Sequence, residues 1–440
     1  MKELKKIEIP VTQLQQGMYV SDLDCGWEKS PFLLQGFIVT SDKIRLKLQE
    51  ICQHVSIDTS RSIDLKKSMN DPTENTFQNK NDGAYRASAK PPPVHKNRYK
   101  KDAQTAKQEV HVAKKSYSVV QENLTGLLSN VDKKSIANPK RMDAASQLLV
   151  TSAISYPSSL PWLAMVQDRD NRAYDHALRT STWALLCGRH IGLSKPDLKH
   201  LAIGTMLKDT GRIHDALQRK QSLSHQKSNS DIDTQLTDYD NLDPKVIDII
   251  ENFRERFNGT GKPRGLVGEE IPLLARVTAI ATAYDFALNP VSEHREQMSP
   301  SQAAAMIYNQ RGRAFQEELA ILFIEAIGTY PTGTIMQLDT GEVAVVVSQD
   351  ENSRLRPHIL IVTDDTGQPI QQKRLVQLGK ESDDDEGEVL NARVMRDLSS
   401  QTINFNLAEL MEEYEVIKAK AKAKQKPTQL ERFKSFWRKK

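Results

Sequence analysis

The sequence has 440 residues, with 61 Lys and Arg against 57 Asp and Glu, and a formal net charge of +4. This length predicts two or three domains. No segment approaches the roughly 18 to 20 consecutive apolar residues that a membrane-spanning helix needs, and we expect no secretory signal. The three cysteines, Cys25, Cys52 and Cys187, fit neither a disulfide framework nor zinc-site spacing. The sequence thus excludes a membrane-spanning protein, a disulfide-rich secreted scaffold and a collagen-like fibre, and it predicts a soluble cytoplasmic protein.

Basic charge is concentrated in two segments. Residues 80–115 carry ten basic and three acidic side chains, and residues 418–440 carry ten and one, so their net charges are +7 and +9. The rest of the chain then carries −12. Such segments are usually solvated linkers or tails. Apolar residues at helical spacing in the tail are compatible with a weak contact between the tail and an anionic membrane surface. Charge alone predicts no specific nucleic-acid partner.

The N-terminal part is predicted to be a small α+β domain, residues 1–66. Alternating apolar residues predict strands near 7–11, 18–23, 37–40 and 55–58, with one helix between the last two. Residues 67–115 are rich in Asn, Gln and Lys and contain three consecutive prolines. We expect them to form a disordered polar and basic linker.

The rest of the chain is predicted to be mainly helical. Between residues 116 and 330 the apolar spacing predicts helices near 142–154, 177–190, 198–207, 246–253, 272–288, 300–311 and 315–327. Residues 331–400 then form a short β extension, with strands near 334–338, 342–347 and 358–362 and an acidic loop at 381–388. Residues 401–440 form a helical segment and the basic tail. The predicted fold class is therefore mainly α: an all-helical domain with a small C-terminal β extension, preceded by a small α+β domain.

One segment is unusually specific: ERFNGTGKPRGLVGEEIPLLAR at residues 255–276, continued by VTAIATAYDFAL. It resembles the signature loop and following helix of the HD-GYP family, whose usual form is HHERxDGxGYPxGLxGxxIPxxAR. Upstream, LKDTGR at residues 207–212 stands where that family has LHDIGK. The stretch VTQLQQGMYV at residues 11–20 is similar to an uncharacterised domain that often precedes HD-GYP domains.

This resemblance implies a phosphodiesterase class that hydrolyses the bacterial messenger cyclic di-GMP in an all-helical HD-type domain. Members hold two or three divalent metals of the iron or manganese type, which suit histidine and carboxylate ligands. Paired metals hold a bridging hydroxide and neutralise charge on the phosphodiester.

The positions that the resemblance assigns to metal ligands are largely substituted. Only His176 and Asp209 keep a residue that can ligate a metal. The other ligand positions are occupied by Arg172, Lys208, Phe253, Arg254 and Thr282. Three of these residues, Arg172, Lys208 and Arg254, are cations. At about 4 Å and an effective dielectric near 20, each like-charge pair costs about 4 kcal/mol, so these three side chains would repel divalent ions. We therefore expect no intact catalytic residue, no metal and no other cofactor.

Other positions are predicted to have structural roles. We expect His176 to be a helix histidine bonded to Asp209, and Tyr284 and Asp285 to be structural. Lys262 replaces the signature tyrosine, so the GYP-like loop consists of Gly261, Lys262 and Pro263. The glycines of this loop region are expected to adopt positive φ: Gly259, Gly261 and Gly265.

The leading hypothesis is a degenerate HD-GYP homologue in bacterial cyclic di-GMP signalling, catalytically inactive and acting as a regulatory or protein-interaction module. Its partners would be cyclic di-GMP or other proteins of that signalling system. One alternative is a metal-free receptor for cyclic di-GMP or another nucleotide, which binds phosphate through Lys208, Arg212 and Arg254. Another is an active, metal-dependent cyclic di-GMP phosphodiesterase with substituted ligands.

Overall fold

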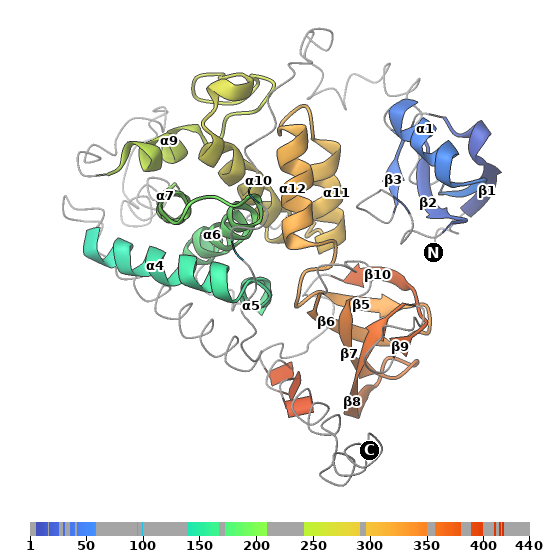
Figure 1. The fold of residues 1–440 in the computed structure, drawn as a ribbon. Helices are drawn as coiled ribbons and strands as arrows, with labels where there is room; N and C mark the ends of the chain where they lie inside the picture. Colours follow the sequence, from blue (N-terminus) through green and yellow to red (C-terminus); the bar gives the residue numbers. More distant parts are fainter. Residues whose placement is uncertain are drawn as a thin grey trace, which may run out of the picture. The chain divides into compact units, whose positions relative to one another are not determined.

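The structure is a computed structural model whose chain divides into two compact units, Met1–Ser88 and Ala89–Lys440 (Figure 1). The residues that it describes are 6–15, 17–25, 30, 36–39, 42–58, 95, 99, 139–166, 172–208, 242–290, 296–349, 357–379, 389–398, 409–410, 413–414 and 416–417. None of the helices in these ranges is long and apolar enough to cross a membrane.

The first unit is a small antiparallel sheet with one helix, as the alternating apolar residues predicted. Its strand order is β1-β4-β2-β3, and every pairing in it is antiparallel. Buried side chains from β2, β4 and the helix form its core, among them Val20, Val55 and Leu48. The elements are β1 (Lys6–Pro10), the 3-10 turn η1 (Val11–Gln13), β2 (Tyr19–Leu23), β3 (Phe37–Ile38), α1 (Asp42–Ile51) and β4 (His54–Asp58).

The second unit begins with a bundle of helices around the long helix α6. Helix α6 packs against α4, α5, α7, α10 and α12. Side chains of Ser194, Asp243 and Ser299 cap α7, α9 and α11, and a proline follows each cap in the first turn. The elements are α4 (Pro139–Ser155), α5 (Ser159–Val166), α6 (Arg172–Ile191), α7 (Lys195–Leu207), α9 (Pro244–Asn252), the 3-10 turn η4 (Gly268–Glu270), α10 (Leu273–Leu288), α11 (Pro300–Asn309) and α12 (Glu317–Ile327). The helical prediction is confirmed, except that α5 was not expected.

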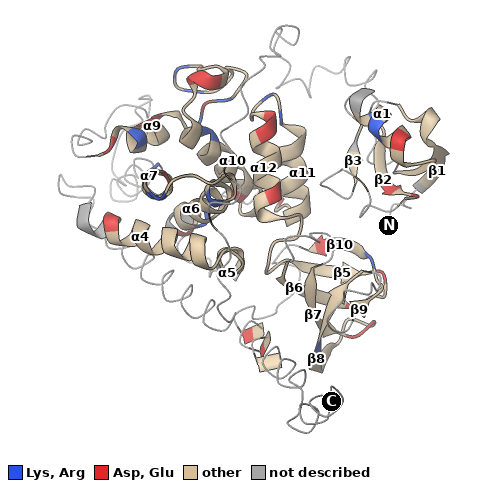
Figure 2. Cartoon of the chain, viewed as in Figure 1, with Lys and Arg blue, Asp and Glu red and all other residues tan. Residues whose placement is uncertain are grey.

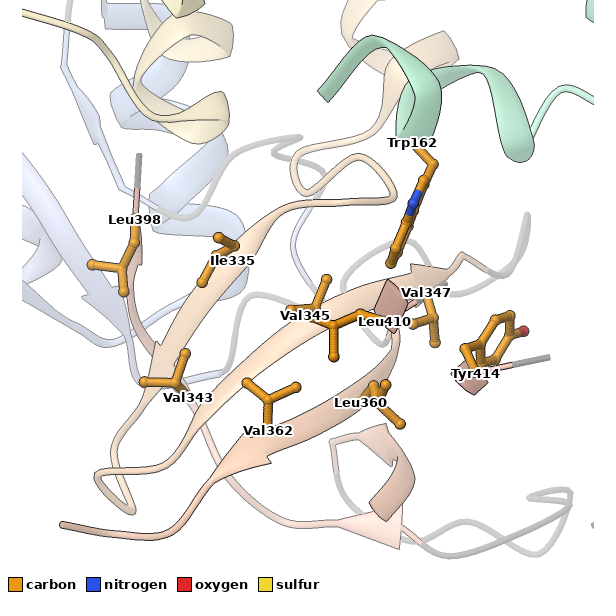
Figure 3. Close-up of a cluster of buried hydrophobic side chains, with 10 residues drawn as sticks. All are labelled: Trp162, Ile335, Val343, Val345, Val347, Leu360, Val362, Leu398, Leu410 and Tyr414. Carbon is orange, nitrogen blue, oxygen red and sulfur yellow. The ribbon is translucent and has the colours of Figure 1, made fainter. Parts of the chain in front are cut away.

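A six-stranded sheet follows the helices, larger than the three predicted strands. Its order is β10-β5-β6-β7-β8-β9. Among these described strands the β8–β9 pairing is parallel and the others are antiparallel. Trp162 of α5 packs on one face of the sheet with Leu410 and Tyr414, so the helices and the sheet share a hydrophobic core (Figure 3). The strands are β5 (Ile335–Leu338), β6 (Val343–Ser348), β7 (His358–Thr363), β8 (Pro369–Leu378), β9 (Val389–Leu390) and β10 (Val394–Leu398).

Two described residues of the predicted linker contact the helical unit. The backbone N–H of His95 donates to the carbonyl of Ile191 at 2.8 Å, and the Tyr99 hydroxyl donates to the carbonyl of Leu193 at 2.7 Å. A Cβ at Gly192, where φ is +78°, would lie 2.3 Å from the His95 carbonyl oxygen, so this turn needs glycine. The acidic loop 381–388 and the basic tail 418–440 lie outside the described residues, and the domain boundaries remain predictions.

Asp397 of β10 joins the sheet to the start of α11. Its carboxylate accepts hydrogen bonds from the Ser299 hydroxyl at 2.8 Å and from the Ser301 backbone N–H and hydroxyl, both at 2.7 Å. Ser299 is also the N-cap of α11. A single half-buried carboxylate therefore fixes the first turn of a helix against an edge strand.

Replacing Asp397 with alanine should lower the free energy of unfolding by about 1 to 3 kcal/mol, because three donors lose a charged acceptor. Urea denaturation of the full chain measures this change. The matched control is Arg396→Ala, the exposed neighbour on the same strand, which should shift the free energy by less than about 0.5 kcal/mol. Equal effects from the two variants would contradict the proposed role of Asp397 in joining β10 to the start of α11.

Candidate functional site

A buried carboxylate on α10 joins this helix to α6. Asp285 is 0% exposed. Its oxygens accept from Arg179 Nε at 2.9 Å and Trp183 Nε1 at 3.3 Å, and they lie 2.6 Å from His176 Nδ1. The three partners lie on α6 at positions i, i+3 and i+7, which share one face of a helix. The side chain of Asn289, the C-cap residue of α10, donates a further bond at 3.3 Å.

The charge of Asp285 is stabilised by these neighbours. Burial alone would raise the pKa of the Asp285 carboxyl, but the Arg179 charge and the His176 hydrogen bond outweigh it and hold the pKa well below its ordinary value. Asp285 is therefore an ionised acceptor at neutral pH, and it orients both His176 and Arg179.

Lys208 contacts the other nitrogen of the same histidine. Its Nζ lies 3.2 Å from His176 Nε2, and the Lys208 side chain is buried, with 5% of the residue exposed. A lysine ammonium carries only donors, so Nε2 accepts this bond and Nδ1–H donates to Asp285. The lone pair of His176 Nε2, which a metal ion would need, is used by Lys208. The imidazole also stacks on Phe286, with ring centroids 4.1 Å apart.

Two of the substituted ligand positions come together on one aromatic ring. Lys208 Nζ and the Arg254 guanidinium carbon lie 5.3 Å and 5.1 Å from the centroid of the Phe253 ring. These distances suit cation–π interactions. Phe253 is the C-cap residue of α9, and Lys208 is the C-cap residue of α7. The ends of two helices thus bring cations to the centre where the resemblance predicts metal ligands.

The remaining predicted positions are only partly described. The Thr282 hydroxyl donates to the Thr278 carbonyl of its own helix at 2.7 Å. Arg172 starts α6, but its side chain lies outside the described residues, as do Asp209 and Arg212. The predicted His176–Asp209 bond therefore stays untested, and Asp285 and Lys208 are two described partners of His176.

A buried glutamate holds the segment that directly follows the GYP-like loop. The Glu255 carboxylate accepts from the backbone N–H groups of Arg264, Gly265 and Leu266 at 2.7, 3.2 and 3.1 Å. The Lys262 backbone N–H donates to the Arg254 carbonyl at 3.3 Å, which ties the loop to the centre. Figure 2 shows basic positions on this segment between α9 and α10.

The physical reason for glycine differs among the three glycines of this loop region, Gly259, Gly261 and Gly265. Gly259 and Gly265 have positive φ, 79° and 66°, as predicted. The φ of Gly261 is not positive, so the prediction is wrong for this residue. A Cβ there would lie 2.2 Å from the backbone nitrogen of Arg256, so close chain packing requires glycine at this position.

Sequence reasoning did not identify the partners of Asp285. Arg179 and Trp183 were not proposed as site residues, although their spacing from His176 places all three on one face of α6. That shared face and the acidic residue in the apolar helix at 273–288 are signals in the sequence, but neither shows that the two helices face each other.

Comparison with known proteins agrees with this architecture. Residues 163–319 match the family model described as HD domain. Residues 6–140 match a domain of unknown function, DUF3391, and residues 335–383 match a KOW domain associated with HD domain. The chain carries an HD domain. The resemblance to the HD-GYP family and to its preceding N-terminal domain is therefore confirmed.

Its relatives include enzymes of cyclic di-GMP turnover. The chain is 24% identical over 387 residues to a cyclic di-GMP phosphodiesterase of Pseudomonas aeruginosa, covering 84% of this chain and 89% of the relative. It is 30% identical over 162 residues to the cyclic di-GMP phosphodiesterase response regulator RpfG of Xanthomonas campestris, covering 34% and 42%. Among solved structures, it is similar to an HDG"Y"P protein from Bdellovibrio bacteriovorus, with 17% identity, a TM-score of 0.39, and coverage of 72% and 98%.

These comparisons correct the prediction that no cofactor is involved. The HD domain and the phosphodiesterase relatives belong to a metal-dependent class, so a claim of no cofactor conflicts with them. The described side chains at the inferred ligand positions nevertheless do not fit a metal pair, because Lys208 uses the free nitrogen of His176 and Phe253 offers no ligand atom. Within the described residues, the only group of side chains spaced for a metal ion is Asp24, Cys25 and Cys52 in the first unit.

Replacing Asp285 with asparagine should cost about 3 to 5 kcal/mol of stability at pH 7, because the buried Arg179 loses its counter-charge. The pKa of Asp285 is lowered in the native state, so its contribution is complete above the unfolded value of 3.8 and is lost as the pH falls below it. Urea denaturation of both proteins at pH 7 and pH 3 should therefore show a smaller difference at pH 3. Glu251→Gln, an exposed carboxyl on α9, is the matched control, and a difference that does not change with pH would contradict the assignment.

Proposed function

We propose that this protein acts in bacterial cyclic di-GMP signalling as a regulatory or protein-interaction module whose HD domain does not hydrolyse the dinucleotide. The similarity to a cyclic di-GMP phosphodiesterase supports the signalling assignment, since it extends over most of both chains. The absence of hydrolysis rests on the residues of the centre.

One observation carries this proposal: the 3.2 Å contact between Lys208 Nζ and His176 Nε2. A histidine that ligates a metal donates the lone pair of one ring nitrogen while the other nitrogen donates its hydrogen to a carboxylate. Asp285 is the carboxylate that accepts the Nδ1 hydrogen, and Lys208 lies where a metal ion would bind Nε2. The result is a histidine held as a ligand would be held, with an ammonium group in the direction of the ligand bond.

The neighbouring substitutions act in the same direction. Where the resemblance predicts two adjacent histidines, the chain has an aromatic ring, Phe253, and a guanidinium, Arg254. Neither offers a lone pair to a metal ion. Hydrolysis by the family's mechanism would have to proceed without those ligands and against the charge of Lys208, so we expect the domain to act by binding or contact.

The purified full chain should release no linear dinucleotide or GMP from cyclic di-GMP, with Mn²⁺ or with Fe²⁺ under anaerobic conditions. Chromatography of the nucleotides after incubation measures this, with buffer and metal alone as the baseline. The His176→Gln variant should behave in the same way as the unmodified chain.

Metal-dependent turnover would contradict the proposal. The decisive result would be turnover that disappears in His176→Gln and persists in His190→Ala, a histidine on the same helix whose partner is Glu325. That pattern would establish the alternative, an active phosphodiesterase with substituted ligands.

A second candidate function is a receptor for cyclic di-GMP. The observation in its favour is that Lys208 and Arg254 both approach the Phe253 ring, which places two cations at one point of the centre. Arginine suits bidentate binding of phosphate. Arg212, the third residue of this hypothesis, lies outside the described residues.

If the receptor hypothesis holds, Arg254→Ala should weaken cyclic di-GMP binding about tenfold or more, because a charge-assisted hydrogen bond contributes about 1.5 to 3 kcal/mol. Isothermal titration calorimetry measures the affinity. Arg374→Ala serves as the control, since this arginine lies on β8 and pairs with Glu342. No binding by the unmodified chain would exclude the receptor and leave a module that acts through protein contacts.

A further inference from the structure

Two cysteines of the first unit lie side by side. Cys25 Sγ and Cys52 Sγ are 3.1 Å apart. Cys25 follows β2, and Cys52 lies between the end of α1 and the start of β4. Strands β2 and β4 are neighbours in the sheet, with Leu23 opposite Val55, so the pair sits where this ladder ends.

The backbone around the two sulfur atoms is fixed by bonds that do not involve them. Asp24 Oδ2 accepts from the backbone N–H groups of Gln53 at 2.9 Å and His54 at 2.7 Å. A disulfide bond is about 2.05 Å long, so the sulfur atoms must approach each other by about 1 Å. We expect side-chain rotation within this frame to bring about so short a movement.

The two thiols differ in accessibility. Cys52 is buried, with 6% of the residue exposed, whereas Cys25 is half-buried. Burial raises the pKa of the Cys52 thiol to about 12, and the hydrogen bonds and charges of Cys25 and Asp24 add to this effect. A small oxidant from solvent therefore reaches Cys25 first, and Cys52 is the protonated thiol beside it.

We propose that Cys25 and Cys52 form a redox modification site, in which hydrogen peroxide converts the two thiols to a reversible intramolecular disulfide. The Cys25 thiolate attacks one peroxide oxygen, the O–O bond breaks, and the released hydroxide takes up a proton to give water and a Cys25 sulfenic acid. Cys52 sulfur then attacks Cys25 sulfur and loses its proton, and the S–O bond breaks to release a second water. Two thiols and one peroxide thus give one disulfide and two waters.

The disulfide would join the end of β2 to the start of β4 and close the chain segment that contains β3 and α1. Such a crosslink restricts the unfolded chain, so the oxidised first unit should resist denaturation better than the reduced one. This inference does not depend on the function proposed for the HD domain, because both cysteines belong to the other unit.

The test is a thiol count on the reduced full chain before and after brief exposure to hydrogen peroxide, by alkylation under denaturing conditions and mass spectrometry. We expect three alkylated cysteines before oxidation and one, Cys187, afterwards, because Cys187 is fully buried in α6. A crosslinked peptide should contain Cys25 and Cys52, and dithiothreitol should restore all three thiols.

The single variants separate the two roles. In Cys52→Ser, Cys25 should accumulate as a sulfenic acid that dimedone traps, whereas Cys25→Ser should keep its two thiols over the same exposure. Cys187→Ser is the matched control and should form the crosslink as the unmodified chain does. Three remaining thiols, a crosslink to Cys187, or a pair that retains Zn²⁺ through dialysis and resists peroxide would overturn the proposal.

Discussion

The organisation of the helical centre depends on one buried charge, the Asp285 carboxylate. A carboxylate with no exposure to solvent is tolerated only with counter-charges and donors, and α6 provides them from one face: Arg179, Trp183 and His176. This requirement fixes how α6 and α10 lie against each other. It also fixes the orientation of the His176 ring and the nitrogen that carries its hydrogen.

The tautomer of His176 in turn makes the burial of Lys208 feasible. An ammonium group excluded from water needs acceptors, and few are available inside a helical bundle. Because Asp285 takes the Nδ1 hydrogen, Nε2 is left as an acceptor that faces Lys208 at 3.2 Å. The Phe253 ring offers a second favourable contact, at 5.3 Å. The carboxylate on α10 thus acts on the C-terminal end of α7 through one imidazole.

Much of the fold could be predicted from the sequence because its local signals agree. Helices α7, α9 and α11 begin with a capping side chain and a proline, and β5, β6 and β7 are short apolar runs bounded by turn residues. Helix α5 was missed because its eight residues are almost all apolar, so no helical period is visible. Strand β8 was missed because its first half is polar and largely exposed, which resembles a loop.

The site was harder to predict, because the ligand positions of a family indicate where the site lies but do not indicate which side chains bond to each other there. The resemblance brought Lys208, Phe253, Arg254 and His176 to one centre, and the structure places these four together. The role of Asp285 could not be read from the segment 277–288, since a lone acidic residue in an apolar helix gives no indication of which distant helix faces it. Pairings over more than 100 residues, such as those of Asp285 with His176 and Arg179, depend on the packing of the whole bundle.

The described contacts of the centre depend on one another. Arg179 balances the charge of Asp285, and the Lys208 ammonium has a nitrogen lone pair and an aromatic face. A histidine at position 253 would remove the ring that both Lys208 and Arg254 approach, and a histidine at position 208 would leave His176 Nε2 without its present donor. A substitution at one of these positions would therefore disturb the contacts of the others. That coupling among Asp285, His176, Lys208 and Phe253 is the physical reason to treat these residues as one unit when any of them is substituted.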